Sequence, residues 1–220
     1  MSVTRISWVP IKAGVDDAAL APLTAAGAAL AKQPGIESIY HGRVLDGATP
    51  SLYALTCKYP PPPISWDSVD AAKAAESSSA FSEIEGILAG VIDTSGAQPY
   101  TNLVSLNKPF SSIVSPVTRI IAIILPATVD KAAFAAELEA SIATAETPGF
   151  KGAVYGWAAD RMEHPSVPGG PANIFVALAG WDSVESSKAS ESAPGMADHQ
   201  AALAKFGGVF EVHYVPLEKA

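Results

Sequence analysis

Along the first half of the chain, the spacing of apolar residues alternates between patterns typical of strands and of helices. A run rich in β-branched residues, Val3–Ile11, predicts a strand, and the helical pattern after it starts at the N-cap candidate Asp16 and stops at Pro34-Gly35. Two further strand patterns, Ser38–Leu45 and Ser51–Tyr59, flank a turn-rich link and predict a hairpin. A second helix and a last strand complete the order strand, helix, strand, strand, helix, strand.

Two features disturb this pattern. Pro22 lies within the first helical stretch, so that helix is expected either to kink or to start late. In the second half of the chain the link between the hairpin strands is longer, about Arg161–Pro171, and is rich in proline and glycine. Such a connection has two interpretations, a lid over a site or a surface loop.

The second half of the chain repeats the first. Val3-Thr4-Arg5-Ile6 recurs as Val117-Thr118-Arg119-Ile120, 114 positions later. Trp66-Asp67-Ser68-Val69 recurs as Trp181-Asp182-Ser183-Val184, at an offset of 115. Separated matches in one order and at nearly one offset predict a tandem duplication.

Each half is expected to form a ferredoxin-like βαββαβ unit, with halves at 1–110 and 111–220 and a seam near 109–116. The sheet of such a unit carries helices on one face only, so its other face needs a cover. Two sheets in one chain can cover each other and close into a barrel without exposed edges. We therefore predict an α+β fold, a pseudo-dimeric α+β barrel of two tandem repeats. The barrel is expected to be complete in a monomer, and a homodimer is optional.

The Trp-x-Ser-Val sequences at Trp66 and Trp181, followed by Lys73-Ala74 and Lys188-Ala189, resemble fungal members of the dimeric α+β barrel superfamily. The nearest groups are the antibiotic-biosynthesis-monooxygenase-like domains and the stress-responsive A/B barrel domains. The resemblance covers nearly the whole chain and implies the barrel fold. The activities it implies range from cofactor-free oxygenation, polyketide cyclisation, decarboxylation and haem degradation to no known reaction.

Histidines found in many members of these groups are replaced in this chain. The first-strand position holds Arg5 or Arg119, and the second-helix position holds Ala72 or Ser187. Two functions are therefore weighed. The first is a cofactor-independent enzyme of secondary metabolism that cyclises, isomerises, decarboxylates or oxygenates a hydrophobic aromatic or polyketide-like substrate. The alternative is a non-catalytic stress-responsive or ligand-carrying barrel protein.

Composition narrows the partners of the chain. Lys and Arg number 14 against 22 Asp and Glu, which gives a formal net charge of −8 and a pI near 4.9. Such a balance argues against nucleic acid or an anionic membrane as partner. The longest aliphatic run, Ile120–Leu125, is far shorter than the roughly 20 residues that span a bilayer. A single cysteine, Cys57, and an N-terminus without a secretory pattern predict a cytoplasmic protein.

Candidate catalytic residues gather in the predicted second strand of the first half. Alternation along Tyr40-His41-Gly42-Arg43 places His41 and Arg43 on one face and Tyr40 on the other. A histidine beside a fixed cation can move a proton while the arginine stabilises an enolate or carboxylate. The competing interpretation is that both face solvent or form a salt bridge. Tyr53 completes the catalytic candidates, and Tyr40 and Trp8 are expected to be walls of a substrate site.

Aromatic residues mark the corresponding stretch of the second half. Tyr155 and Trp157 are expected either to bind a flat apolar ligand or to fill the core. The last strand is expected to bring His213 and Tyr214 towards His41, which would assemble a substrate site from both halves.

Other chemistry is not indicated. Arg5 and Arg119 stand at matched positions and are expected either to form structural ion pairs or to bind an anion. No His-x-x-x-His, Cys-x-x-Cys or carboxylate cluster supports a metal site, and no glycine-rich phosphate loop is present, so no metal and no cofactor are expected. The expected ligand is a hydrophobic small molecule.

Overall fold

The computed structural model divides the chain into two units. Unit 1 comprises residues 1–106 and 215–220, and unit 2 comprises residues 107–214. The structure describes residues 3–32, 36, 38–45, 52–59, 79–95, 99–144, 147–163, 167 and 170–219. Within these residues, every helix is too short or too polar to cross a membrane.

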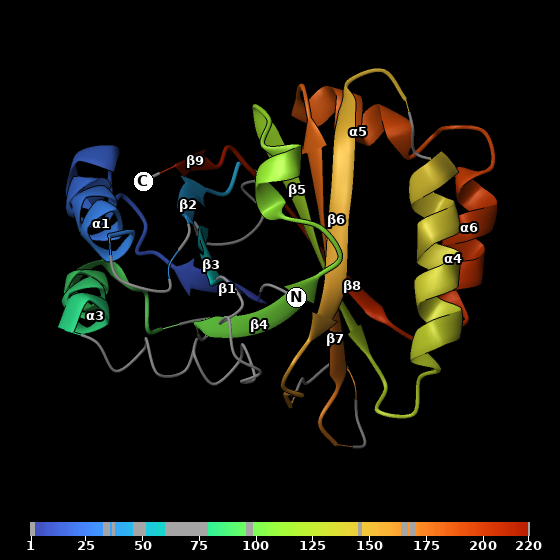
Figure 1. Ribbon diagram of the computed structural model, residues 1–220, viewed down its shortest axis with the longest axis horizontal. Coiled ribbons are helices and arrows are strands. Elements are labelled where there is room, and N and C mark those ends of the chain that lie inside the picture. Colours follow the sequence, from blue (N-terminus) through green and yellow to red (C-terminus); the bar gives the residue numbers. More distant parts are fainter. Residues whose placement is uncertain are drawn as a thin grey trace. The chain divides into compact units, whose positions relative to one another are not determined.

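Unit 1 is a mixed α+β unit built on an antiparallel sheet. Its elements are β1 (Val3–Pro10), α1 (Asp17–Leu30), β2 (Ser38–Arg43), β3 (Leu52–Tyr59), α3 (Ser79–Val91), β4 (Tyr100–Leu106) and β9 (Glu218–Lys219). The strand order is β4-β1-β3-β2-β9, and each of these pairs is antiparallel. Helices α1 and α3 pack against each other on one side of the sheet (Figure 1).

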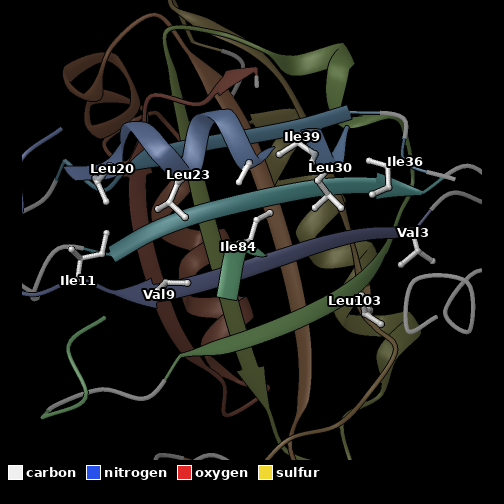
Figure 2. Close-up of a cluster of buried hydrophobic side chains, with 11 residues drawn as sticks. Val3, Val9, Ile11, Leu20, Leu23, Leu30, Ile36, Ile39, Ile84 and Leu103 are labelled. Carbon is white, nitrogen blue, oxygen red and sulfur yellow. The ribbon is translucent and has the colours of Figure 1, made fainter. Parts of the chain in front are cut away.

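The core of unit 1 lies between that face of the sheet and the two helices. Alternation along β1 directs its odd-numbered residues towards the helices, and the other strands follow through their register. Figure 2 shows the resulting aliphatic cluster, which contains Val3, Val9, Ile11, Leu20, Leu23, Leu30, Ile36, Ile39, Ile84 and Leu103. Burial of these side chains holds α1 and α3 on the sheet.

Helix α1 begins where the sequence predicts. Asp16 has an extended backbone, and its Oδ1 accepts a hydrogen bond of 2.8 Å from the backbone N–H of Ala19. Pro22 lies inside the helix, which nevertheless runs from Asp17 to Leu30. Of the two expected alternatives, the late start is therefore wrong, and the kink stays a prediction. Burial of Leu20 and Leu23 on either side of the proline accounts for a helix that continues past it.

Unit 2 is also mixed α+β with an antiparallel sheet. Its elements are the 3₁₀ turn η1 (Phe110–Ile113), β5 (Val117–Leu125), α4 (Lys131–Thr144), β6 (Phe150–Ala158), β7 (Asn173–Trp181), α5 (Val184–Ser190), α6 (Met196–Ala204) and β8 (Val209–Val215). The strand order is β8-β5-β7-β6. Helices α4 and α6 pack against each other over one face of this sheet (Figure 1).

Two helices stand in unit 2 where the sequence predicts a single second helix. Ser183 caps the first of them, α5, through a capping box with Ser186. Gly195, which follows Pro194, then takes a positive φ of 84° and separates α5 from α6. The corresponding stretch of the first half, with Trp66 and Ser68, lies outside the described residues.

The boundary between the units falls a few residues before the predicted seam. Asn107 belongs to unit 2 because its backbone N–H donates to the carbonyl of Tyr155, and its side-chain Oδ1 accepts from the N–H of Tyr155. Phe110 and Ile113 of η1 are buried in the same unit. Residues 215–220 return to unit 1, where Glu218 and Lys219 pair with β2.

Candidate functional site

Arg43, a predicted catalytic residue, connects β2 to the start of α1. Its Nη2 donates to the backbone carbonyl of Val15 at 2.7 Å and lies 3.4 Å from Oδ1 of Asp17. The Asp17 side chain is 95% exposed, so the ion pair adds little to stability. These contacts agree with the competing interpretation, in which Arg43 forms a salt bridge. They hold its guanidinium at the start of α1.

His41 is buried on the helix-facing side of β2, with 7% of its surface exposed. Burial lowers the pKa of His41 from its ordinary value of 6.5, and the nearby Glu218 carboxylate opposes part of this shift. The imidazole is therefore neutral near pH 7. Glu218 of β9 is the strand partner of His41.

The other first-half candidates divide between the two faces of the sheet. Trp8 is 1% exposed and stacks on Tyr100, with their ring centroids 4.9 Å apart. Tyr40 is buried on the face of β2 opposite to His41. The backbone of Tyr53 stands opposite Arg43, and its side chain lies outside the described residues. The structure thus does not bring the predicted wall residues onto the face that carries His41.

Tyr155 and Trp157 of unit 2 contribute to an aromatic core. Trp157 meets Phe134 and Phe175 edge to face, and Nζ of Lys131 lies 4.6 Å from the centre of its ring. The Tyr155 hydroxyl donates to Oε1 of Glu139 at 2.8 Å. Burial and this carboxylate raise the pKa of Tyr155 above its ordinary value, so it stays protonated at neutral pH.

His213 and Tyr214 follow each other on β8 and therefore face opposite sides of that strand. Tyr214 is buried, and Nζ of Lys188 lies 5.6 Å from the centre of its ring. The predicted meeting of these residues with His41 stays a prediction.

A cavity of about 430 Å³ lies between the sheet of unit 2 and its helices. Small side chains on neighbouring strands leave this space, since β6 contributes Ala153 and β7 contributes Ala177 and Ala179 to the helix-facing side. Larger apolar side chains surround it from the sheet and from α4 and α6, among them Ile121, Ile123, Leu138, Ile142, Phe150, Met196 and Leu203. Its volume lies in the range of roughly 300–1,000 Å³ that is typical of small-molecule sites.

One end of the unit 2 cavity is polar. Nη2 of Arg119 lies 2.8 Å from Oε1 of Glu191, and the two side chains are 17% and 43% exposed. The ion-pair interpretation of Arg119 is thus confirmed, and the pair stands beside the cavity. Trp181 lines the same space and packs on Phe150, with their ring centroids 5.0 Å apart.

A smaller cavity, about 260 Å³, lies between the sheet of unit 1 and its helices. Its walls are mainly apolar side chains of α1 and α3, including Leu23, Ile84 and Leu88. The sheet contributes Arg5, Ser7, Trp8 and Val9 from β1 and Thr101 from β4, so the predicted wall residue Trp8 borders this cavity. His41 and Arg43 are not among the residues that line either cavity.

Sequence reasoning missed both cavities. The signal that marks the larger one is the alternation Ala177-x-Ala179 in a strand pattern, because alanines on one face leave room beneath the helices. A single strand shows this weakly, since Ala153 joins the pair only through the register of β6 and β7. In the part of the chain that the structure describes, no group of three or more His, Cys, Asp or Glu side chains could hold a metal ion.

No protein-family model matches this sequence, and no curated protein matches it. Solved structures do resemble it. A putative monooxygenase from Fusobacterium nucleatum subsp. nucleatum ATCC 25586 superposes with a TM-score of 0.63 at 8% identity, over 99% of this chain and 93% of that one. A putative monooxygenase from Lactobacillus acidophilus NCFM gives 0.58 at 10% identity, over 100% and 95%. An anthrone oxidase-like protein gives 0.61 at 10% identity, over 100% and 93%.

These comparisons show the fold alone: the chain is a mixed α+β protein that resembles structures of the dimeric α+β barrel fold. The α+β class predicted from the sequence is confirmed, and the closed barrel of two tandem repeats stays a prediction. At 10% identity or less, likeness to these barrel-fold proteins concerns the backbone, so arguments about ligands rest on the side chains of the two cavities.

Proposed function

We propose that this barrel-fold protein is a cofactor-independent enzyme that binds a flat, hydrophobic aromatic molecule in the unit 2 cavity and oxygenates it. The observation that carries the proposal is the apolar cavity of about 430 Å³ with one ion pair, Arg119–Glu191, at its end. Apolar walls favour an aromatic body, and a single polar end orients it. The names of the neighbouring structures, monooxygenase and anthrone oxidase-like, support the same reaction class.

The ion pair suggests how the reaction would proceed. The Glu191 carboxylate removes a proton from an activated CH₂ group next to the aromatic system, and the Arg119 guanidinium stabilises the enolate oxygen that results. The carbanion reacts with O₂ and forms a C–O bond. The hydroperoxide then loses water and leaves a carbonyl group, so CH₂ and O₂ become C=O and H₂O. The substrate supplies the electrons, and no cofactor takes part.

A second candidate function, a ligand carrier without activity, is favoured by a different observation. The Glu191 carboxylate already accepts from Arg119, and the residues known to line the unit 2 cavity include no His, Cys or Tyr. A cavity of this kind can bind a ligand without activating it.

The decisive experiment follows binding and turnover of a tricyclic aromatic ketone with an acidic CH₂ group. Binding is read from calorimetry, and turnover from O₂ uptake and the absorbance of the quinone. We expect Ala177→Leu, which fills the cavity, to abolish both. Glu191→Gln should retain binding within a few-fold and reduce turnover at least 100-fold. Glu163→Gln, an exposed change in the link between β6 and β7, is the matched control.

The outcomes separate the candidates. Binding that Ala177→Leu removes, without any turnover, supports the carrier. Turnover that survives Glu191→Gln unchanged contradicts the proposed mechanism. If His41→Ala loses turnover while Glu191→Gln keeps it, the active site lies in unit 1, as the sequence predicts.

We also propose that the two units descend from a tandem duplication and that the chain is a monomer. The repeated Val-Thr-Arg-Ile and Trp-Asp-Ser-Val sequences support the duplication. The strand orders support it as well, since β1 lies between β4 and β3 and β5 lies between β8 and β7. Sedimentation of the full chain tests the monomer, and a concentration-dependent dimer would contradict it.

A further inference from the structure

The unit 1 cavity carries a pair of hydroxyl groups that has no equivalent at the matched first-strand position of unit 2. Ser7 of β1 and Thr101 of β4 are direct partners in the sheet, and their oxygens lie 2.9 Å apart. Nη2 of Arg5 donates to Oγ1 of Thr101 at 3.5 Å. The residue at the Ser7 position of unit 2 is Ile121.

The geometry of this pair leaves a donor for a ligand. Two hydroxyl groups that share one hydrogen bond use one of their two hydrogens, whichever group donates. Arg5 donates to Thr101, so the remaining hydrogen lies either on Thr101 itself or on Ser7, the hydrogen-bond partner of Thr101. Ser7 and Thr101 both line the cavity, so this donor is available at the cavity wall.

The remaining lining residues limit the shape and charge of the ligand. An apolar surface is offered by Leu23 of α1, by Ile84 and Leu88 of α3 and by Ile92, the residue after α3. The Glu85 carboxylate also lies in the lining, which disfavours a molecule with several negative charges. The volume of about 260 Å³ admits a smaller molecule than the cavity of unit 2.

We propose that the unit 1 cavity is a second ligand site, which binds a small aromatic molecule whose carbonyl or carboxylate oxygen accepts a hydrogen bond from the Ser7–Thr101 hydroxyl pair. This site is independent of the reaction proposed for unit 2. The chain thus carries two sites of different ligand class, a large apolar one and a small one that selects for an oxygen acceptor.

The test uses the full chain and probes that differ only in the acceptor. Benzoate, acetophenone and toluene are titrated at millimolar concentration, and backbone amide shifts identify the unit that responds. We expect benzoate and acetophenone to shift amides of unit 1 and to bind at least 10-fold more tightly than toluene. Ser7→Ala should reduce both to the level of toluene without changing toluene itself. Ser105→Ala, an exposed serine on the same strand β4, is the control.

Two further variants keep the result interpretable. Thr101→Val removes the other hydroxyl from a more exposed position and should weaken the same probes even if Ser7→Ala fails to fold. Ala177→Leu should leave binding unchanged, because it fills only the unit 2 cavity. Equal binding of toluene and acetophenone, shifts confined to unit 2, or no saturable shift with any probe would each overturn the proposal.

Discussion

Each of the two units has a cavity between its own sheet and its own helices, yet the two cavities differ in size and polarity. On the helix-facing side, unit 1 carries Ser7 and Ile39 where unit 2 carries Ile121 and Ala153. Ile39 is fully buried in its unit, whereas Ala153 lines the larger cavity. Replacing one large side chain by alanine opens space, and replacing isoleucine by serine adds a donor. A few positions within one strand order are therefore enough to change the ligand class.

The cores beside the cavities differ as well. The described core of unit 1 is an aliphatic cluster. In unit 2, Phe134 packs edge to face against Trp157, Phe175 and Phe206. Phe134 and Phe175 share this core with Leu138, Ala177 and Leu203, which line the larger cavity.

Truncation at matched core positions should test this difference most strongly. Phe134→Ala is expected to cost about 3–5 kcal/mol of unfolding free energy, because a fully buried ring and its aromatic contacts are lost. Leu20→Ala, at the equivalent place on α1, should cost about 2–4 kcal/mol. Hydrogen exchange followed by unit is the measurement, since two units need not unfold together. Equal loss of protection throughout the chain for both variants would show that the units unfold as one.

Exchange of the side chains at the matched positions 39 and 153 sharpens the comparison. Ile39 shares a core with Leu23 and Ile84, which line the unit 1 cavity, so Ile39→Ala should open space beside that cavity, cost about 2–4 kcal/mol and allow a two-ring acid such as 2-naphthoate to bind there. Ala153→Ile should weaken binding in unit 2 by about 10-fold or more, and strain from overpacking should cost about 1–3 kcal/mol. Calorimetry measures both effects. Unchanged selectivity in both variants would contradict the role assigned to these side chains.

Helix caps offer a pair of changes with equal expected effects. Asp16 accepts from one backbone N–H of α1, and Oδ1 of Asp130 accepts at 3.0 Å from those of Ala132 and Ala133 of α4. Asp16→Ala and Asp130→Ala should each cost about 1 kcal/mol. Denaturant unfolding measures the loss. Asp→Asn at each position serves as the control, because an asparagine caps nearly as well.

The smallest expected effect is a difference in pH dependence between His41 and its counterpart Tyr155. The folded pKa of His41 is below 6.5, so the unfolded chain binds a proton first as the pH falls through 6.5. The contribution of His41 to the unfolding free energy is therefore lost as the pH falls below 6.5. Above pH 6.5 this contribution stays constant. His41→Gln should flatten the unfolding free energy between pH 5 and pH 7, whereas Tyr155→Phe should leave that interval unchanged. A steeper profile in His41→Gln would contradict the sign.

Much of the local structure follows from the sequence, because it depends on residues close together in the chain. The β-branched runs at Val3 and Val117 form strands, Asp16 caps its helix, and Ser183 forms a capping box. Alternation also predicts that His41 and Tyr40 face opposite sides of β2. The break at Gly195 was open to the same reasoning, because a Pro-Gly pair inside a helical pattern is a stop signal.

The candidate site depended on contacts between distant residues, which only the tertiary structure decides. The sequence suggests Arg43 as a catalytic partner of His41, but in the structure its guanidinium donates to the backbone carbonyl of Val15, 28 positions earlier. The larger cavity arises because register sets Ala153 beside Ala179 on the neighbouring strand, and the Arg119–Glu191 pair joins a strand to the end of α5. The sequence by itself determined which segments become strands and helices, since period and capping are local. Tertiary structure decided which side chains face each other across the remaining space, because that depends on register and on the volumes of residues far apart in the chain.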